Sequence, residues 1–107
     1  LARTSPRLTH LKLEDDPSPM KVSQVIAVNP AVKVMGGLGG MMFLEELRHG
    51  AIGTMTGFAF PEILVAIHRA WVAGDRDGAT AIFYKYCPLI RFENQPRINL
   101  AIRKHIY

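Results

Sequence analysis

The sequence predicts an α/β fold in which a parallel sheet is covered by helices. Strand-like and helix-like segments alternate along the first part of the chain, and the strand-like segments are apolar almost throughout. Strands with one face in water alternate apolar and polar residues, whereas strands covered on both faces form continuous apolar runs. The order β-α-β-α-β-α, followed only by helices, therefore indicates parallel strands joined by helical crossovers.

The first strand is expected from Leu8 to Leu13, where the polar, proline-rich loop EDDPSP closes it. A short helix from Met20 to Val28 follows, because its apolar residues recur at helical spacing, and Asn29-Pro30 ends it. A second strand, AVKVM, runs directly into the glycine loop Gly36–Gly40, whose sequence is GGLGG. The helix after this loop ends at His49-Gly50, a basic residue followed by glycine.

The third strand is predicted from Ile52 to Phe60, with the sequence IGTMTGFAF. Pro61-Glu62 begins an amphipathic helix, since proline is well tolerated at the first helical position, and Gly74-Asp75 ends it. Two more helices are expected from about Asp77 to Phe92 and from about Pro96 to His105. Because three strands cannot close a barrel and the chain begins at Leu1 without methionine, we expect a C-terminal piece of something larger.

Composition narrows the classes of function. The chain has 107 residues, 49% of them hydrophobic, and a formal net charge of +4. Its basic residues are scattered singly, with no basic and aromatic stripe, so nucleic-acid binding is not expected. No apolar run approaches the roughly 20 residues of a membrane span, and no signal peptide opens the chain. The single cysteine, Cys87, excludes an intrachain disulfide and favours a packed thiol in a cytoplasmic protein.

The polar residues do not form a metal-binding pattern. The four histidines show no HxxxH spacing and no cluster with cysteine or aspartate, so we expect no metal and no cofactor. Glu45 and Glu46 are expected on a solvated helix face.

A candidate site follows from the position of three segments. In parallel α/β proteins, ligands bind beyond the carboxyl ends of the strands, where this sequence places Lys12 to Glu14, the glycine loop and Thr54 to Gly57. A lysine partly stripped of water has a lowered pKa, because its ammonium form is disfavoured. The free amine can then attack a ketone and form an imine.

Each of these residues has a simpler explanation as well. Lys12 could be an edge-strand lysine with its head in solvent, and Glu14 could pair with it, which would raise the pKa of the lysine. The glycine loop suits an anion or simply a tight strand-to-helix turn. Thr54 and Thr56 either line a site or pack into the core.

Four stretches together resemble one known family. LKLED, GGLGG, EELRHGAIGTMTGFAFPE and RFENQPRINLAIRKHIY resemble the C-terminal part of the dihydrodipicolinate synthase and N-acetylneuraminate lyase family. Within this family, the four stretches most resemble the sequences of dehydratases and aldolases that act on 2-keto-3-deoxy sugar acids. The resemblance implies that residues 1–75 form the last β/α units, about strands 6–8, of a (β/α)8 barrel, with helices 76–107 packed on it. It also implies a homotetramer that acts on pyruvate or another 2-keto acid.

The resemblance extends to particular residues. Lys12 matches the lysine that forms a Schiff base with the keto acid, and would be the nucleophile of a lyase. Gly37 and Leu38 match the loop that lines the substrate site, and Met55 or Thr54 matches the backbone of the eighth strand near the keto acid. The loop lacks the acidic or hydroxyl residue common in synthases, which leaves aldol condensation, aldol cleavage and dehydration open. The family's proton-relay tyrosine and threonine pair belong to earlier strands.

Two other classes of function compete with a lyase. One is a non-catalytic binding module that uses the glycine loop for a phosphate or carboxylate. The other is a structural barrel fragment whose helices after Asp75 serve only assembly.

Overall fold

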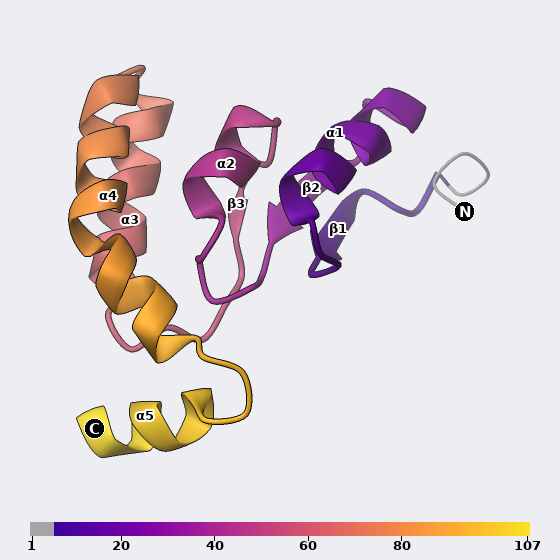
Figure 1. Cartoon of the computed structure of the whole chain (residues 1–107). Helices are drawn as coiled ribbons and strands as arrows, with labels where there is room; N and C mark the ends of the chain where they lie inside the picture. Colours follow the sequence, from indigo (N-terminus) through magenta and orange to yellow (C-terminus); the bar gives the residue numbers. More distant parts are fainter. Residues whose placement is uncertain (1–5) are drawn as a thin grey trace.

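The computed structural model describes residues 6–107 as a parallel sheet with helices beside it. Its elements are β1 (His10–Leu13), α1 (Ser18–Val28), β2 (Lys33–Gly36), α2 (Phe43–Arg48), β3 (Gly53–Thr54), α3 (Pro61–Val72), α4 (Arg76–Glu93) and α5 (Asn99–Ile106). α3 and α4 stand side by side at one end of the molecule, and α5 runs across below them (Figure 1). The predicted α/β alternation followed by helices is confirmed.

The three strands form one sheet in the order β1-β2-β3, and both neighbouring pairs are parallel. Leu13 pairs with Gly36, and Gly36 pairs with Thr54. The carboxyl ends of the strands therefore meet at one edge of the sheet, as the sequence predicts.

The third strand is much shorter than predicted. Only Gly53 and Thr54 are in strand conformation, although the apolar run extends from Ile52 to Phe60. Its last ladder bond joins the Met55 amide to the Gly36 carbonyl at 2.9 Å. Beyond Gly36 the neighbouring chain turns into the glycine loop, so the rest of the run has no strand beside it within residues 6–107. Phe58 packs into the helical core instead and is 5% exposed.

Other boundaries differ at the ends of elements. β1 begins at His10 instead of Leu8, α1 begins at Ser18 instead of Met20, and α5 begins at Asn99 instead of Pro96. Such shifts are common because element ends fray and their hydrogen bonds are shared with caps and turns.

The apolar core has two parts. The larger part lies among α2, α3 and α4 and consists of Phe43, Leu44, Leu47, Phe58, Ile63, Leu64, Ile67, Ala79, Phe83, Cys87 and Ile90. The smaller part joins α1 to the sheet and consists of Val22, Val32, Val34 and Ala51. Cys87 is a buried free thiol, as expected. Within residues 6–107, every helix is too short or too polar to cross a bilayer.

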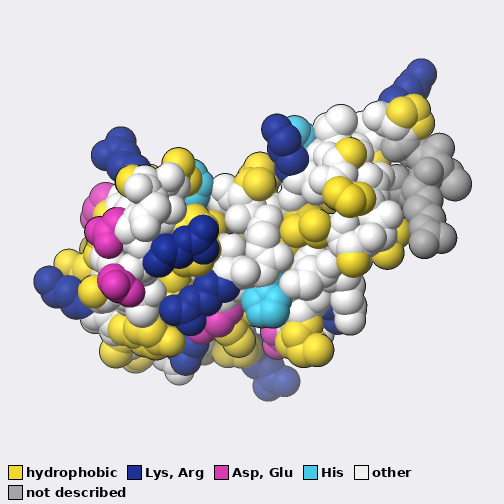
Figure 2. All heavy atoms as spheres, turned by 90° about the horizontal axis from the view of Figure 1, so that it is seen from above, with side chains coloured by type: hydrophobic (Ala, Val, Ile, Leu, Met, Phe, Trp, Pro, Cys, Tyr) yellow, Lys and Arg dark blue, Asp and Glu magenta, His cyan; other side chains and the backbone are white. Residues whose placement is uncertain are grey.

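β1 lies at the edge of the sheet in the described chain. Its residues alternate between exposed and half-buried, with His10 and Lys12 exposed. An apolar groove runs between β1 and α1, lined by Leu8, Leu11, Leu13, Lys21, Gln24, Val25 and Val28. Hydrophobic side chains also gather over α1 on the face shown in Figure 2. The expected burial of both strand faces is therefore absent at β1 in this chain.

Candidate active site

A pocket of about 400 Å³ lies at the carboxyl edge of the sheet. Four segments contribute to it: the end of β1, the glycine loop, the loop after β3, and the junction of α4 with α5. Its lining residues are Lys12, Glu14, Gly37, Leu38, Gly39, Met41, Thr56, Gly57, Asn94, Pro96, Asn99 and Arg103. This volume is typical of sites for small molecules.

Lys12 lies against the glycine loop. An added Cβ on Gly37 would stand 2.5 Å from Lys12 Cε and 2.5 Å from Glu14 Oε1, so only glycine leaves room for these side chains. Lys12 Nζ is 3.3 Å from Glu14 Oε1, and the two side chains are 38% and 50% exposed. The structure thus brings Lys12, Gly37 and Leu38 together, and the ion pair with Glu14, considered as an alternative from sequence, is formed.

Two other glycines of the loop accommodate side chains from elsewhere in the fold. Gly39 has a φ of +65°, and an added Cβ would overlap the side chain of Asn94. An added Cβ on Gly36 would overlap the carboxylate of Glu46. Asn94 Nδ2 donates to the Gly39 carbonyl at 2.9 Å. The glycines of this loop are therefore explained largely by close packing, and Gly37 is the one that faces Lys12.

Glu46 is buried, contrary to the expected solvated position. It is 1% exposed, and its Oε1 accepts a hydrogen bond from Ser18 Oγ at 2.6 Å. Burial raises the pKa of Glu46; the hydrogen bond from Ser18 opposes this shift and the nearby charge of Glu45 adds to it. The expectation was wrong because α2 packs against α1 behind Gly36, which encloses this side of the helix.

Thr54 and Met55 lie outside the Lys12 pocket. Thr54 Oγ1 is buried and has no hydrogen-bond partner within residues 6–107, and Thr54 lines a separate cavity with Phe43 and His68. Met55 is 53% exposed. Thr56 and Gly57, further along the same loop, line the pocket with Lys12 instead.

Histidines and acidic residues are dispersed in the described chain. His68 Nε2 lies 2.9 Å from the Ile52 carbonyl, and His49 Nδ1 lies 2.7 Å from Ser23 Oγ. Among residues 6–107 no three His, Cys, Asp or Glu side chains come together in an arrangement that could hold a metal ion.

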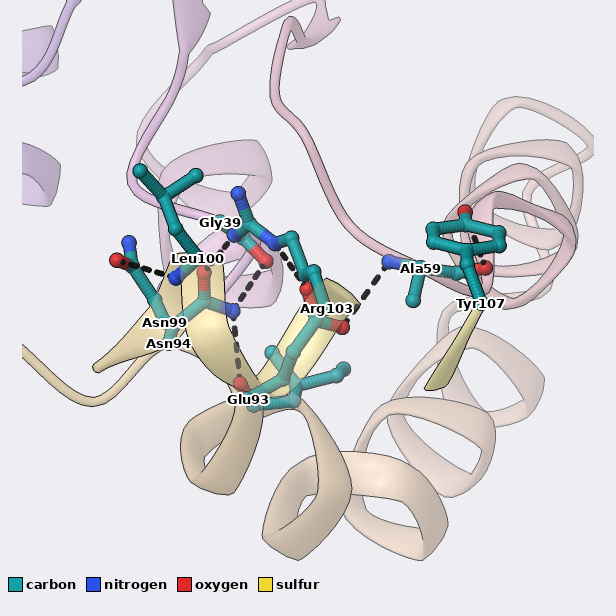
Figure 3. Close-up of polar contacts among 9 residues, drawn as sticks. Gly39, Ala59, Glu93, Asn94, Asn99, Leu100, Arg103 and Tyr107 are labelled. Carbon is teal, nitrogen blue, oxygen red and sulfur yellow. Dashed lines mark hydrogen bonds and ion pairs between the residues drawn. The ribbon is translucent and has the colours of Figure 1, made fainter. Parts of the chain in front are cut away.

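A third charged side chain, that of Arg103, reaches the pocket from α5. Arg103 is ion-paired with Glu93 through Nε, and its Nη2 donates to Asn94 Oδ1 at 2.7 Å (Figure 3). Glu93 is fully buried and its Oε2 also accepts the Ala59 amide at 3.0 Å. Sequence reasoning assigned none of these residues to the site. A signal existed, because Glu93 lies three positions after Ile90 on the apolar face of α4, an unusual place for an unpaired carboxylate.

Comparisons with known proteins agree with this architecture. No family model matches the chain. The chain is 31% identical over 97 residues to L-2-keto-3-deoxyarabonate dehydratase from Azospirillum brasilense. The aligned residues cover 89% of this chain and 31% of that protein. It superimposes on dihydrodipicolinate synthase from Rhodopseudomonas palustris with a TM-score of 0.83 and 34% identity, over 91% of this chain and 34% of that one.

These two similarities support the dihydrodipicolinate synthase family for this chain. The family resemblance inferred from the sequence is confirmed. The chain spans about a third of the length of both relatives.

Proposed function

We propose that the chain forms the last β/α units of a (β/α)8 barrel, about strands 6–8, with residues 76–107 as helices packed on that barrel. The parallel order β1-β2-β3 supports this proposal, as does the likeness to about a third of a dihydrodipicolinate synthase. The apolar groove between β1 and α1 would receive the preceding β/α unit. Such a groove left uncovered would expose Leu11 and Leu13 to water.

The proposed activity is that of a Schiff-base lyase acting on pyruvate or a related 2-keto acid, with Lys12 as the nucleophile. One observation carries this proposal: the side chain of Lys12 lies over Gly37, inside a pocket at the carboxyl edge of a parallel sheet. Ligands of parallel α/β folds bind at that edge. The dehydratase and the synthase named above, which are 31% and 34% identical in sequence to this chain, support the same class of chemistry.

The chemistry follows from an amine and a carboxylate held together. The neutral amine of Lys12 adds to the C2 carbonyl of the keto acid, and loss of water from the resulting carbinolamine leaves an iminium. Glu14, 3.3 Å from Lys12 Nζ, is placed to accept and return the protons of these steps. The iminium then takes up the electron pair of a C3–H or C3–C4 bond and becomes an enamine. Aldol condensation, aldol cleavage and dehydration of a 2-keto-3-deoxy acid all proceed through this enamine.

Reductive trapping tests the proposal in the intact protein. Borohydride added with pyruvate is expected to fix an adduct on the peptide that contains Lys12, which mass spectrometry detects. Lys12→Ala should abolish the adduct. Lys33→Ala is the matched control, because Lys33 is an exposed lysine at the opposite end of β2, and it should keep the adduct. A wild-type protein that gains no mass at Lys12 would refute the proposed activity, and unchanged ligand affinity in Lys12→Ala would favour a binding module.

We also propose that the intact protein is a cytoplasmic homotetramer. Large apolar side chains exposed on α4 and α5, among them Phe92 at 60% and Leu100 at 65%, support an assembly interface. Sedimentation of the intact protein would measure its mass.

A further inference from the structure

Arg103 has donor groups that residues 6–107 do not use. A guanidinium carries five N–H donors in a rigid plane. Nε is committed to Glu93, and Nη2 makes one bond to Asn94 Oδ1. Nη1 has no protein partner within residues 6–107 and lies beside Gly57, where an added Cβ would be 3.2 Å away. Arg103 thus lines the Lys12 pocket with unsatisfied donors.

The orientation of this guanidinium is fixed from behind. Glu93 is fully buried and is itself held by the Ala59 amide. Asn94 accepts from Arg103 and donates to the carbonyls of Ile90 and Gly39 at 2.7 and 2.9 Å. Figure 3 shows the Asn94 side chain bonded both to Gly39 of the glycine loop and to Arg103. Because Nε and Nη2 are both tied back to α4, the guanidinium plane cannot turn away from the pocket without breaking these bonds.

The position of these donors relative to Lys12 limits what they can bind. Lys12 enters the pocket from β1 and Arg103 enters from α5, so a keto acid joined to Lys12 through C2 would share the pocket with the free donors of Arg103. The glycine loop itself offers Leu38 and no polar side chain. Nη1 of Arg103 is therefore free to donate to an oxygen atom that a substrate brings into the pocket. Pyruvate ends in a methyl group and supplies none there.

We propose that Arg103 donates hydrogen bonds to the oxygen-bearing tail of a 2-keto acid longer than pyruvate, and so sets the substrate class of the site. This inference rests on the proposed Schiff-base function. A hydrogen bond to a charged donor contributes more than one between neutral groups, and its loss typically weakens binding by about tenfold or more.

The test compares two keto acids in the intact protein by borohydride trapping at Lys12. The probes are pyruvate and L-2-keto-3-deoxyarabonate, and the measurement is the ratio of their half-saturating concentrations. Arg103→Lys retains a positive charge for Glu93 but lacks the planar fork, so it should shift this ratio against the longer acid by about tenfold. Arg91→Lys is the matched control, since Arg91 is exposed on α4 outside the pocket, and it should leave the ratio unchanged.

A second variant keeps the ion pair intact in case Arg103→Lys fails to fold. Gly57→Ala would place a methyl group 3.2 Å from Nη1 and crowd the free nitrogen, so it should shift the same ratio in the same direction by roughly threefold. An unchanged ratio in a folded Arg103→Lys or Gly57→Ala protein would overturn the inference while the Schiff-base function stands. So would a wild type that traps pyruvate at lower concentrations than the longer acid. A wild type that traps neither acid would overturn the proposed function itself.

Discussion

Two ion pairs contribute side chains to the same pocket and differ in how far water reaches them. Lys12, Glu14 and Arg103 line the pocket, whereas Glu93 is fully buried outside its lining. In the Lys12–Glu14 pair the side chains are 38% and 50% exposed. In the Arg103–Glu93 pair the arginine is 19% exposed and the glutamate is fully buried. Exposed pairs contribute about 0–1 kcal/mol, whereas removing one partner of a buried pair typically costs about 3–5 kcal/mol.

This difference separates a mobile side chain from a fixed one. The Lys12 side chain can leave Glu14 at little cost, because water replaces the lost contact, so the ion pair does not hold it in one position. Arg103 cannot leave Glu93 without stranding a buried carboxylate. The pocket therefore combines a lysine side chain that is free to move with an arginine side chain that is held in place.

Removal of each cation in turn should give the largest effect and tests the comparison directly. Arg103→Met leaves Glu93 buried without a partner and should lower the free energy of unfolding by about 3–5 kcal/mol. Lys12→Met, at the exposed pair, should lower it by less than about 1 kcal/mol. Urea unfolding of the intact protein measures both. Equal losses would show that burial does not distinguish the pairs.

The contact between Asn94 and the glycine loop should give the next largest effect. In Gly39→Ala the new methyl group would overlap Asn94 and the backbone would stay at positive φ, so we expect a loss of about 2–4 kcal/mol. Gly74→Ala is the matched control, because Gly74 also has positive φ but nothing within 4 Å of an added Cβ, and about 1 kcal/mol is expected. Thermal or urea unfolding measures the difference. A Gly39→Ala loss no greater than that of Gly74→Ala would contradict the close approach of Asn94.

Glu46 extends the comparison to a buried carboxylate that has a hydroxyl partner instead of a guanidinium. Burial raises the pKa of Glu46 above its ordinary value of 4.5 in the folded state. Between 4.5 and that raised pKa the folded state binds more protons than the unfolded state, so stability falls as pH rises through this window. Glu46→Gln should remove this decline while the amide oxygen still accepts from Ser18.

The expected result is a stability difference between Glu46→Gln and wild type that grows in favour of the variant as pH rises from 4.5. Urea midpoints across pH 4 to 8 measure it. Glu62→Gln, an exposed glutamate at the start of α3, serves as control and should follow the wild-type profile. A stability difference that stays constant with pH would mean that the pKa of Glu46 is the same in the folded and unfolded states.

Much of the fold could be predicted because its signals are local. Helical spacing of apolar residues located α1, α3 and α4, and Asn29-Pro30 and Gly74-Asp75 marked where helices end. Most of the run Ile52–Phe60 is not in strand conformation, because a strand requires a neighbouring strand and β2 ends at Gly36. β-propensity alone does not supply that neighbour.

Some features of the candidate site could likewise be predicted from the sequence, and others could not. Lys12, Gly37 and Leu38 could be placed together from sequence, since the ends of parallel strands share one edge of the sheet. The burial of Glu46 could not be predicted, because a helix of six residues shows too little periodicity to reveal its covered face. Thr54 and Met55 were expected beside Lys12, but neither lines the pocket to which Thr56 and Gly57 contribute, and Thr54 lines a separate cavity.

By itself the sequence determined the order of strands and helices and the end of the sheet at which Lys12 and the glycine loop would lie. These features depend on residue spacing and on glycine and proline, which act over a few positions. Only the tertiary structure decided that Asn94 would bond Gly39, 55 positions away, and that Arg103 would face the pocket. The apolar core between α2, α3 and α4 sets the position of α4, so the end of this helix lies beside the glycine loop through contacts distant in the sequence.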